Sequence, residues 1–276
     1  MVGVTLLVLF GIGVLTGLTT VLFGFGGGFV AVPVVIRADA SLGADAMRVA
    51  TATSLAVMVV SAAFATAVTP RSTLARLRGS GPLITLLAAG GALGALASLR
   101  APAEPVRWAF VAYVATTLAD LLARPGFLRP HSGRAATAEP RRLPNVLGAP
   151  IGAIAAFLGV GGSVMTVPAM RRAGHTMHVA TVLANPLTLA VALPAAVVSL
   201  SCSPATDAAT AAAVTAHASV PLVGTVDLRA AAALLLGALP VIAVLRRRPP
   251  RISDSAHARA YAALLAAVTV AMLPLN

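Results

Sequence analysis

Long apolar runs alternate with short polar segments along the whole chain. The continuous apolar runs are 4–23, 46–68, 82–99, 106–122, 144–160, 178–200, 228–245 and 258–274. A weaker ninth run, 208–225, is rich in Ala and Thr and holds His217 and Pro221. Most of these runs lack a polar face, which is typical of helices buried in lipid or in a helix bundle. The alternating pattern of membrane β-barrels is absent. The sequence therefore predicts an all-α polytopic transmembrane helix bundle of eight or nine spans.

The composition supports a membrane protein. Of the 276 residues, 58% are hydrophobic and only 10% are charged, whereas a soluble domain carries about 25% charged residues. At about 20 residues for each spanning helix, the length leaves no room for a sizeable soluble domain. We therefore expect a multi-pass protein of the cell (inner or plasma) membrane, with the lipid bilayer as a partner. The sequence leaves the oligomeric state open and allows a homo-oligomer.

The net charge of +12 comes from 20 basic residues, all arginine, against 8 acidic residues. The arginines lie between the apolar runs, which indicates topology and contact with anionic headgroups. Aromatic residues make up 4% of the chain, too few for a platform on which bases stack. No nucleic-acid partner is expected.

Three arginine-bearing segments constrain the topology: 69–81, 123–143 and 246–257. The positive-inside rule places all three in the cytoplasm. Nine crossings with a cytoplasmic N-terminus satisfy this placement, and eight do not. Arg171 and Arg172 would then face the outside, which argues against nine, so the number of crossings stays open.

The sequence gives no sign of an enzyme. Cys202 is the single cysteine, and the five histidines form no HxxxH or HExxH pair, so no metal site and no cofactor are expected. The chain has no lysine for a phosphate-binding loop that would couple transport to ATP. Asp120 lies four residues before Arg124, a spacing that favours an ion pair at a helix end.

An internal repeat is the strongest feature of the sequence. Residues 24–33 read GFGGGFVAVP and residues 159–168 read GVGGSVMTVP, with matching positions 135 residues apart. Each copy is followed by an echo, RVAT at 48–51 and HVAT at 178–181. The chain thus divides into a first membrane repeat, 1–122, an arginine-rich and cytoplasmic linker, 123–143, and a second membrane repeat, 144–276.

Clustered glycines after an apolar run break the helix inside the membrane, where free backbone groups are tolerated only in protein or a wet cavity. Paired breaks in two halves point to the binding site of a transporter, with the N–H groups of each half-helix facing an anion. Close helix packing is the alternative interpretation. Gly26 and Gly161 are expected to approach one another near mid-membrane. The candidate substrate-binding residues are Gly24, Gly26, Gly27, Gly28, Arg48, Thr53, Ser54, Gly159, Gly161, Gly162, Ser163, His178 and Asn185.

The polar candidates have different expected roles. Arg48 and its counterpart His178 can neutralise an anion, although Arg48 can equally snorkel toward headgroups. Thr53 and Ser54 can offer hydroxyl groups, and the alternative is a bond to the preceding turn. Asn185 adds an amide at a predicted break beside Pro186. Asp227 is expected to cap a helix.

These motifs resemble the sulfite exporter TauE/SafE family of membrane transporters. The resemblance rests on GFGGG with VP at 24–33, AxxTSL at 50–55, the second copy at 159–168 and GxVD at 224–227. It implies a multi-helix inner-membrane carrier of small anions, often sulfur-containing ones such as sulfite or organosulfonates. Two departures are Ser163 in place of the third glycine, and VLANP at 182–186 where the first copy has TSL.

We therefore expect an integral membrane secondary transporter of a small anionic substrate, with export favoured over uptake. A passive anion channel and a non-transporting accessory membrane subunit are the alternatives.

Overall fold

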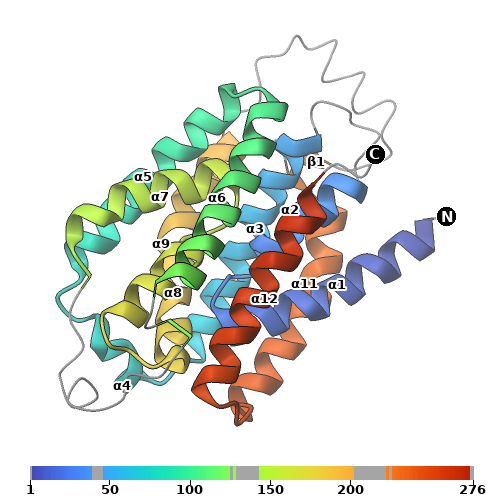
Figure 1. Cartoon of the computed structure of the whole chain (residues 1–276). Helices are drawn as coiled ribbons and strands as arrows, with labels where there is room; N and C mark the ends of the chain where they lie inside the picture. Colours follow the sequence, from blue (N-terminus) through green and yellow to red (C-terminus); the bar gives the residue numbers. More distant parts are fainter. Residues whose placement is uncertain are drawn as a thin grey trace.

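The structure is a computed structural model that describes residues 2–38, 46–124, 127–128, 143–201, 222–223 and 226–273. Figure 1 shows a bundle of helices with a short two-stranded hairpin at one side. The helices are α1 (Val2–Phe23), α2 (Gly28–Ala38), α3 (Ala46–Ala67), α4 (Arg71–Leu74), α5 (Gly81–Arg100), α6 (Ala103–Ala123), α7 (Gly148–Leu158), α8 (Ser163–Arg172), α9 (Met177–Ser201), α11 (Leu228–Arg247) and α12 (Asp254–Met272). The strands β1 (Leu222–Val223) and β2 (Val226–Asp227) pair antiparallel.

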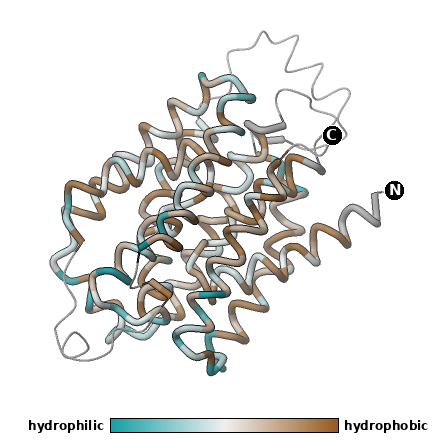
Figure 2. Tube along the Cα trace, viewed as in Figure 1, coloured by the Kyte–Doolittle hydropathy of each residue, from teal (hydrophilic) through white to brown (hydrophobic). Residues whose placement is uncertain are grey.

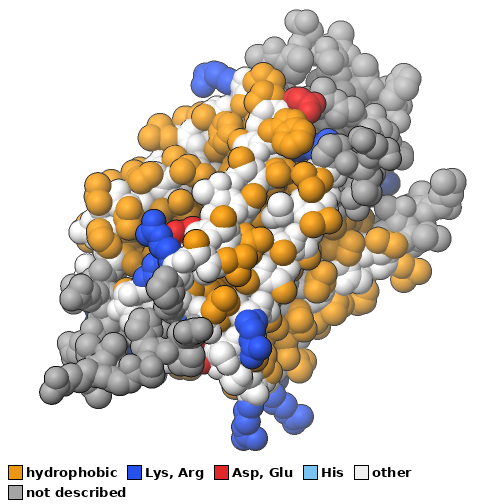
Figure 3. Space-filling model, in the orientation of Figure 1, with side chains coloured by type: hydrophobic (Ala, Val, Ile, Leu, Met, Phe, Trp, Pro, Cys, Tyr) orange, Lys and Arg blue, Asp and Glu red, His pale blue; other side chains and the backbone are white. Residues whose placement is uncertain are grey.

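The surface of the bundle suits a lipid environment. Figure 2 shows hydrophobic residues along the helices, with hydrophilic residues mainly near their ends. Apolar side chains cover most of the face seen in Figure 3. Leu7, Leu93 and Leu236 are each more than 60% exposed, which costs free energy in water but not against hydrocarbon. The all-α membrane bundle predicted from the sequence agrees with this fold.

Arginine-bearing segments from distant parts of the chain gather at one end of the bundle, which we call the arginine end. Pro70 lines one cavity with Arg246 and Arg251. Arg172 pairs with Asp120 at the end of α6. The predicted common side for 69–81 and 246–257 thus agrees with the structure, and the end of α6, which leads into 123–143, lies there too.

Six described helices are long and apolar enough to cross a membrane. They are α3, α5, α6, α9, α11 and α12. This is fewer than the eight or nine spans expected. Most of the predicted ninth run, 208–225, lies outside the described residues, apart from Leu222–Val223 in β1. The helices before and after this run, α9 and α11, both reach the same region of α3. Ser199 of α9 lines a small cavity with Thr51, and the Asp227 N–H, just before α11, donates to the Thr53 hydroxyl.

Helices α1 and α2 form a hairpin that enters from the end opposite the arginines. Gly13 packs against Leu234 and Gly17 against Ala238, so α1 runs parallel to α11 toward the arginine end. The chain turns at 24–27, and α2 then returns beside α3. The run 4–23 is therefore an arm of a hairpin, although its length and hydropathy predicted a crossing.

Helices α7 and α8 form a second hairpin that enters from the arginine end. Gly148 packs against Leu83 and Gly152 against Leu87, so α7 runs parallel to α5 and away from that end. Helix α8 returns there and ends at Arg172. The run 144–160 is therefore also a hairpin arm. This arrangement removes the objection to the topology, because Arg171 and Arg172 lie with the other arginines.

The contacts of the first hairpin have counterparts in those of the second. Helix α1 packs on α11 as α7 packs on α5, and α2 packs on α3 as α8 packs on α9. Small residues allow these approaches, because a methyl group at Gly13, Gly17, Gly148 or Gly152 would collide with the facing backbone. Helices α3 and α9 lie against one another and run antiparallel. Val68 shares a cavity with Val182 at one end, and Thr51 shares one with Ser199 at the other.

Candidate functional site

The two glycine turns meet in the middle of the bundle. A methyl group placed on Gly26 would lie 3.0 Å from Thr188 Cγ2 and 3.4 Å from Met58 Cγ. One placed on Gly161 would lie 2.7 Å from Met58 Sδ and 3.1 Å from Thr188 Cγ2. Both turns therefore touch the same two side chains, one at mid-length of α3 and one on α9. This agrees with the expected approach of Gly26 and Gly161.

Each turn also leans on the long helix that follows the other hairpin. A methyl group on Gly24 would meet the Thr181 carbonyl and lie 2.8 Å from Ala184 Cβ, both on α9. One on Gly159 would lie 2.9 Å from Thr51 Cγ2 and 3.1 Å from Ser54 Oγ, both on α3. The Ser54 hydroxyl donates a hydrogen bond that is shared between two carbonyl oxygens, that of Thr51 at 2.8 Å and that of Gly159 at 3.0 Å.

Left-handed backbone makes both turns possible. The residues with positive φ in the turns are Gly24, Gly26, Gly27, Gly159 and Gly161. At Gly26 and Gly161 the φ values of 61° and 73° reverse the chain and bring backbone against a neighbouring side chain, which a Cβ would prevent. Helices α2 and α8 begin directly after these turns, so their first N–H groups have no partner within the helix. Such N-termini carry partial positive charge at the centre of the bundle.

Buried polar groups surround the two turns. Thr16, Thr51, Ser54, Ser163, Thr166, Thr181, Asn185 and Thr188 are all buried. Within the part of the chain that the structure describes, no hydrogen-bond partner is present for Thr16 Oγ1, Thr51 Oγ1, Ser163 Oγ, Thr166 Oγ1 or Asn185 Oδ1. An unpaired buried polar atom costs about 1–3 kcal/mol. Several of them around one point form a polar lining that a ligand or water can satisfy.

The structure brings only some of the predicted polar candidates to the turns. Asn185 lies on α9 between Thr181 and Thr188 and donates through Nδ2 to the Thr181 carbonyl oxygen, at 3.2 Å. The Thr53 hydroxyl instead accepts the Asp227 N–H at 2.9 Å and ties α3 to β2.

Arg48 and His178 lie at opposite ends of the bundle. Arg48 is in the first turn of α3, and its side chain lies outside the described residues. His178 is in the first turn of α9 and lines a cavity at the arginine end. They do not converge on the glycine turns.

Other predicted residues have structural partners. Asp120 pairs with Arg124, with 2.7 Å between Oδ1 and Nε, which confirms the expected ion pair. The Asp227 carboxylate accepts the N–H groups of Arg229 and Ala230 at 2.8 and 3.1 Å, which confirms the expected cap of α11. Cys202 and His217 lie outside the described residues.

Met58 and Tyr261 contribute to the site, and no motif marked either of them. Met58 fills the space between the two turns. Tyr261 donates its hydroxyl to the carbonyl oxygens of Ser163 and Val164, at 3.3 and 3.2 Å, while its ring packs on Phe25 at 5.2 Å between centroids. One side chain of α12 thus contacts both hairpins.

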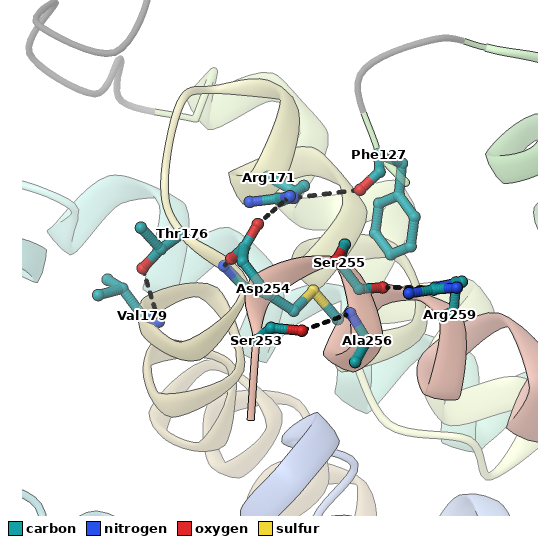
Figure 4. Close-up of polar contacts among 10 residues, drawn as sticks. Phe127, Arg171, Thr176, Val179, Ser253, Asp254, Ser255, Ala256 and Arg259 are labelled. Carbon is teal, nitrogen blue, oxygen red and sulfur yellow. Dashed lines mark hydrogen bonds and ion pairs between the residues drawn. The ribbon is translucent and has the colours of Figure 1, made fainter. Parts of the chain in front are cut away.

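The end of the second hairpin is held by two ion pairs, of which Figure 4 shows the one between Arg171 and Asp254. Arg171, whose side chain is 3% exposed, pairs with Asp254 of α12 and donates through Nε to the Phe127 carbonyl oxygen at 3.3 Å. Asp254 also accepts the Met177 N–H at 2.8 Å. Arg172 pairs with Asp120 of α6. These contacts fix α8 to the two helices beside it.

Of the comparisons with known proteins, the one with protein families gives a match. Neither the curated proteins nor the solved structures compared with the chain give a match. Among protein families, the one described as Sulfite exporter TauE/SafE matches residues 9–272. These residues include the first hairpin from residue 9 onward, the whole second hairpin and all six candidate spans. The chain therefore belongs to the sulfite exporter TauE/SafE family of multi-pass membrane transporters.

Proposed function

We propose that the protein is a secondary transporter that exports a small anion, such as sulfite or an organosulfonate. The observation that carries the proposal is the meeting of two glycine-broken hairpins from opposite ends of the bundle, with Met58 and Thr188 between them. Discontinuous helices whose N-termini meet near the middle of the membrane are the usual substrate sites of secondary transporters.

The transporter is built from two inverted repeats, 1–122 and 144–276, joined by the linker 123–143. The reciprocal contacts of the two hairpins support this, as do the antiparallel α3 and α9. The packing glycines add to it, since Gly13 and Gly17 precede Gly148 and Gly152 by the same 135 residues that separate the two glycine motifs. An inverted repeat gives the site two equivalent routes of access, one from each side.

The anion binds between the hairpin tips. Backbone N–H groups of Gly26–Gly28 and Gly161–Ser163 bind its oxygens, because they begin α2 and α8 and carry partial positive charge. The unpaired hydroxyl group of Ser163 and the amide of Asn185 complete the site, while the Ser54 hydroxyl holds the second turn in place through the Gly159 carbonyl oxygen. Met58 occupies this space when no substrate is bound, and its flexible side chain can withdraw at low cost.

Access alternates as one hairpin moves against the long helices. By the positive-inside rule the arginine end faces the cytoplasm, so export begins there. A passive channel would need a continuous polar path, whereas the contacts of Met58 with both turns close the path at the centre. These contacts favour a carrier over a channel.

The test is transport of labelled sulfite, sulfate and a simple sulfonate by proteoliposomes. The variant is Gly161→Ala, which strains a positive φ and collides with Met58. The matched control is Gly11→Ala, because a methyl group there meets nothing within 4 Å. Size-exclusion profile and helicity establish that each variant is folded.

We expect saturable transport of one anion, lowered at least about tenfold by Gly161→Ala and unchanged by Gly11→Ala, since the strain of an alanine at this positive φ costs about 1–3 kcal/mol at the tip that binds the anion. Equal transport by all three proteins would place the site elsewhere. Transport that does not saturate would favour the channel. No transport of any of the three anions would reject the substrate class.

A further inference from the structure

A large cavity opens at the arginine end, outside the point where the two glycine turns meet. Its volume is about 760 Å³, and its basic lining consists of Arg246, Arg248, Arg251, His178 and His257. No carboxylate is among its described lining residues. A cavity of this size is typical of small-ligand sites, and its charge selects for anions.

Arg246 is the side chain best placed to bind an anion in this cavity. Its Nε and Nη2 atoms are buried and have no hydrogen-bond partner among the residues that the structure describes. The carboxylates of Asp254 and Asp120 at this end of the bundle pair with other arginines, Asp254 with Arg171 and Asp120 with Arg124 and Arg172. A guanidinium group binds two oxygens of one oxyanion through two parallel N–H donors. Arg246 thus lines the cavity and has two adjacent unpaired donors, buried beneath the cavity wall, that an oxyanion can satisfy once the guanidinium turns toward it.

The inner wall of the cavity adjoins the first glycine turn. Val21 and Leu22, in the last turn of α1 before Gly24, line the cavity. Val182 lines it too and follows Thr181, whose carbonyl oxygen abuts Gly24. His257 completes this wall, with a ring nitrogen bonded to the Leu22 carbonyl oxygen. The cavity therefore extends from the arginine end to within one turn of the first hairpin's tip.

We propose that this cavity is the intake site of the transporter, where Arg246 binds the substrate oxyanion before it reaches the hairpin tips. This rests on the proposed function and adds a second, outer site to it. Because the cavity is much larger than a sulfite-sized ion, the anion binds there with part of its hydration shell, and Arg248 and Arg251 attract it over a longer range.

A phosphate of a lipid headgroup offers the same oxyanion chemistry, so the experiment has to separate the two sources. Sulfite is titrated calorimetrically, without oxygen, into the full chain in nanodiscs of phosphatidylcholine alone and in nanodiscs that also hold phosphatidylglycerol. The variants are Arg246→Gln, which removes the charge, and Arg246→Lys, which keeps it. Arg247→Gln is the matched control, since Arg247 has the same charge on the same helix but is exposed and does not line the cavity.

In phosphatidylcholine we expect Arg246→Gln to weaken sulfite binding about tenfold, as loss of a charge-assisted hydrogen bond does. Arg246→Lys restores most of the affinity, and Arg247→Gln leaves it unchanged. In transport assays with sulfite on the arginine side, Arg246→Gln raises KM about tenfold and leaves kcat within about twofold, because the central site is intact.

Three results would overturn the intake site. One is equal weakening by Arg246→Gln and Arg247→Gln, which would indicate general surface charge. The second is unchanged binding in Arg246→Gln. The third is sulfite binding that phosphatidylglycerol abolishes, with Arg246→Gln removing the lipid effect, which would make the headgroup the occupant. Arg246-dependent binding in a chain that transports no anion would support the outer site while rejecting the proposed function, so the two can fail separately.

Discussion

The two hairpins share a backbone design but are held in place by different forces. The tip of the first hairpin is packed by aromatic rings, with Phe25 4.8 Å from Phe29 and 5.2 Å from Tyr261 between centroids. The tip of the second hairpin carries small residues, and its other end is fixed by the ion pairs of Arg171 and Arg172. Ring packing does not depend on salt or pH, whereas ion pairs depend on both. The same turn geometry is thus stabilised in two ways, one that depends on salt and pH and one that does not.

The largest expected effect comes from loosening the second hairpin at its charged end. Arg171→Gln leaves Asp254 without its cation. A fully buried pair broken in this way costs about 3–5 kcal/mol. Because Asp254 is 28% exposed, we expect the free energy of unfolding in detergent to fall by about 2–3 kcal/mol. Arg172→Gln is the control, since its pair with Asp120 is more exposed and is worth less than about 1 kcal/mol. Equal effects of the two substitutions would mean that burial of Arg171 does not matter.

A medium effect is expected at Tyr261, which contacts both hairpins from α12. Tyr261→Phe removes the hydroxyl that binds the Ser163 and Val164 carbonyl oxygens but keeps the ring on Phe25. The free energy of unfolding should fall by about 1 kcal/mol. Tyr261→Leu should cost more, because it also removes the ring from the first hairpin. Comparable unfolding curves for the Phe and Leu variants would show that the ring contributes little to the first hairpin.

The smallest expected effect is the pH dependence of stability that His175 contributes. His175 lies between α8 and α9, and burial, with a smaller contribution from Arg76, lowers its pKa below 6.5. In the unfolded chain His175 gains its proton at about pH 6.5, while in the folded protein it stays neutral to lower pH. Its contribution to stability is therefore lost as the pH falls from about 6.5 through the folded pKa.

His175→Gln removes this titration. Unfolding compared at pH 7.5 and pH 5.5 should show a smaller acid-induced loss of stability in the variant than in the native chain. An identical pH slope in both proteins would contradict the expected shift.

The sequence predicted the helical class and the glycine breaks, because each depends on local residue type. The expected eight or nine crossings are not confirmed, since six of the described helices are long and apolar enough to span. The length and hydropathy of 4–23 and 144–160 suit a spanning helix and a hairpin arm equally, since neither property records the direction in which the chain leaves the turn. The signal that could have separated them was Arg171–Arg172, which fits the positive-inside rule only if α8 returns to the arginine end.

The candidate site was predicted in part for a similar reason. Gly26 and Gly161 were found because two copies of one motif are visible in the sequence. Met58 and Tyr261 were missed because a lone methionine or tyrosine in an apolar helix has no motif, and its role depends on which helix faces it. Thr53 was a candidate by its type, yet the turn of α3 directs it to β2 and leaves Ser54 facing the second hairpin.

The contact between the two hairpin tips also determines where the membrane potential falls across the protein. Water and ions that enter the arginine-end cavity reach within a turn of Gly24. The membrane potential therefore falls over the thin layer of backbone turns, Met58 and Thr188 and the half-bundle beyond it, and less over the wet cavity. A single negative charge that passes this layer exchanges up to about 2.3 kcal/mol with the membrane for each 100 mV. Under the proposed function, a membrane that is negative inside would thus drive the anion outward across this layer and the half-bundle beyond it.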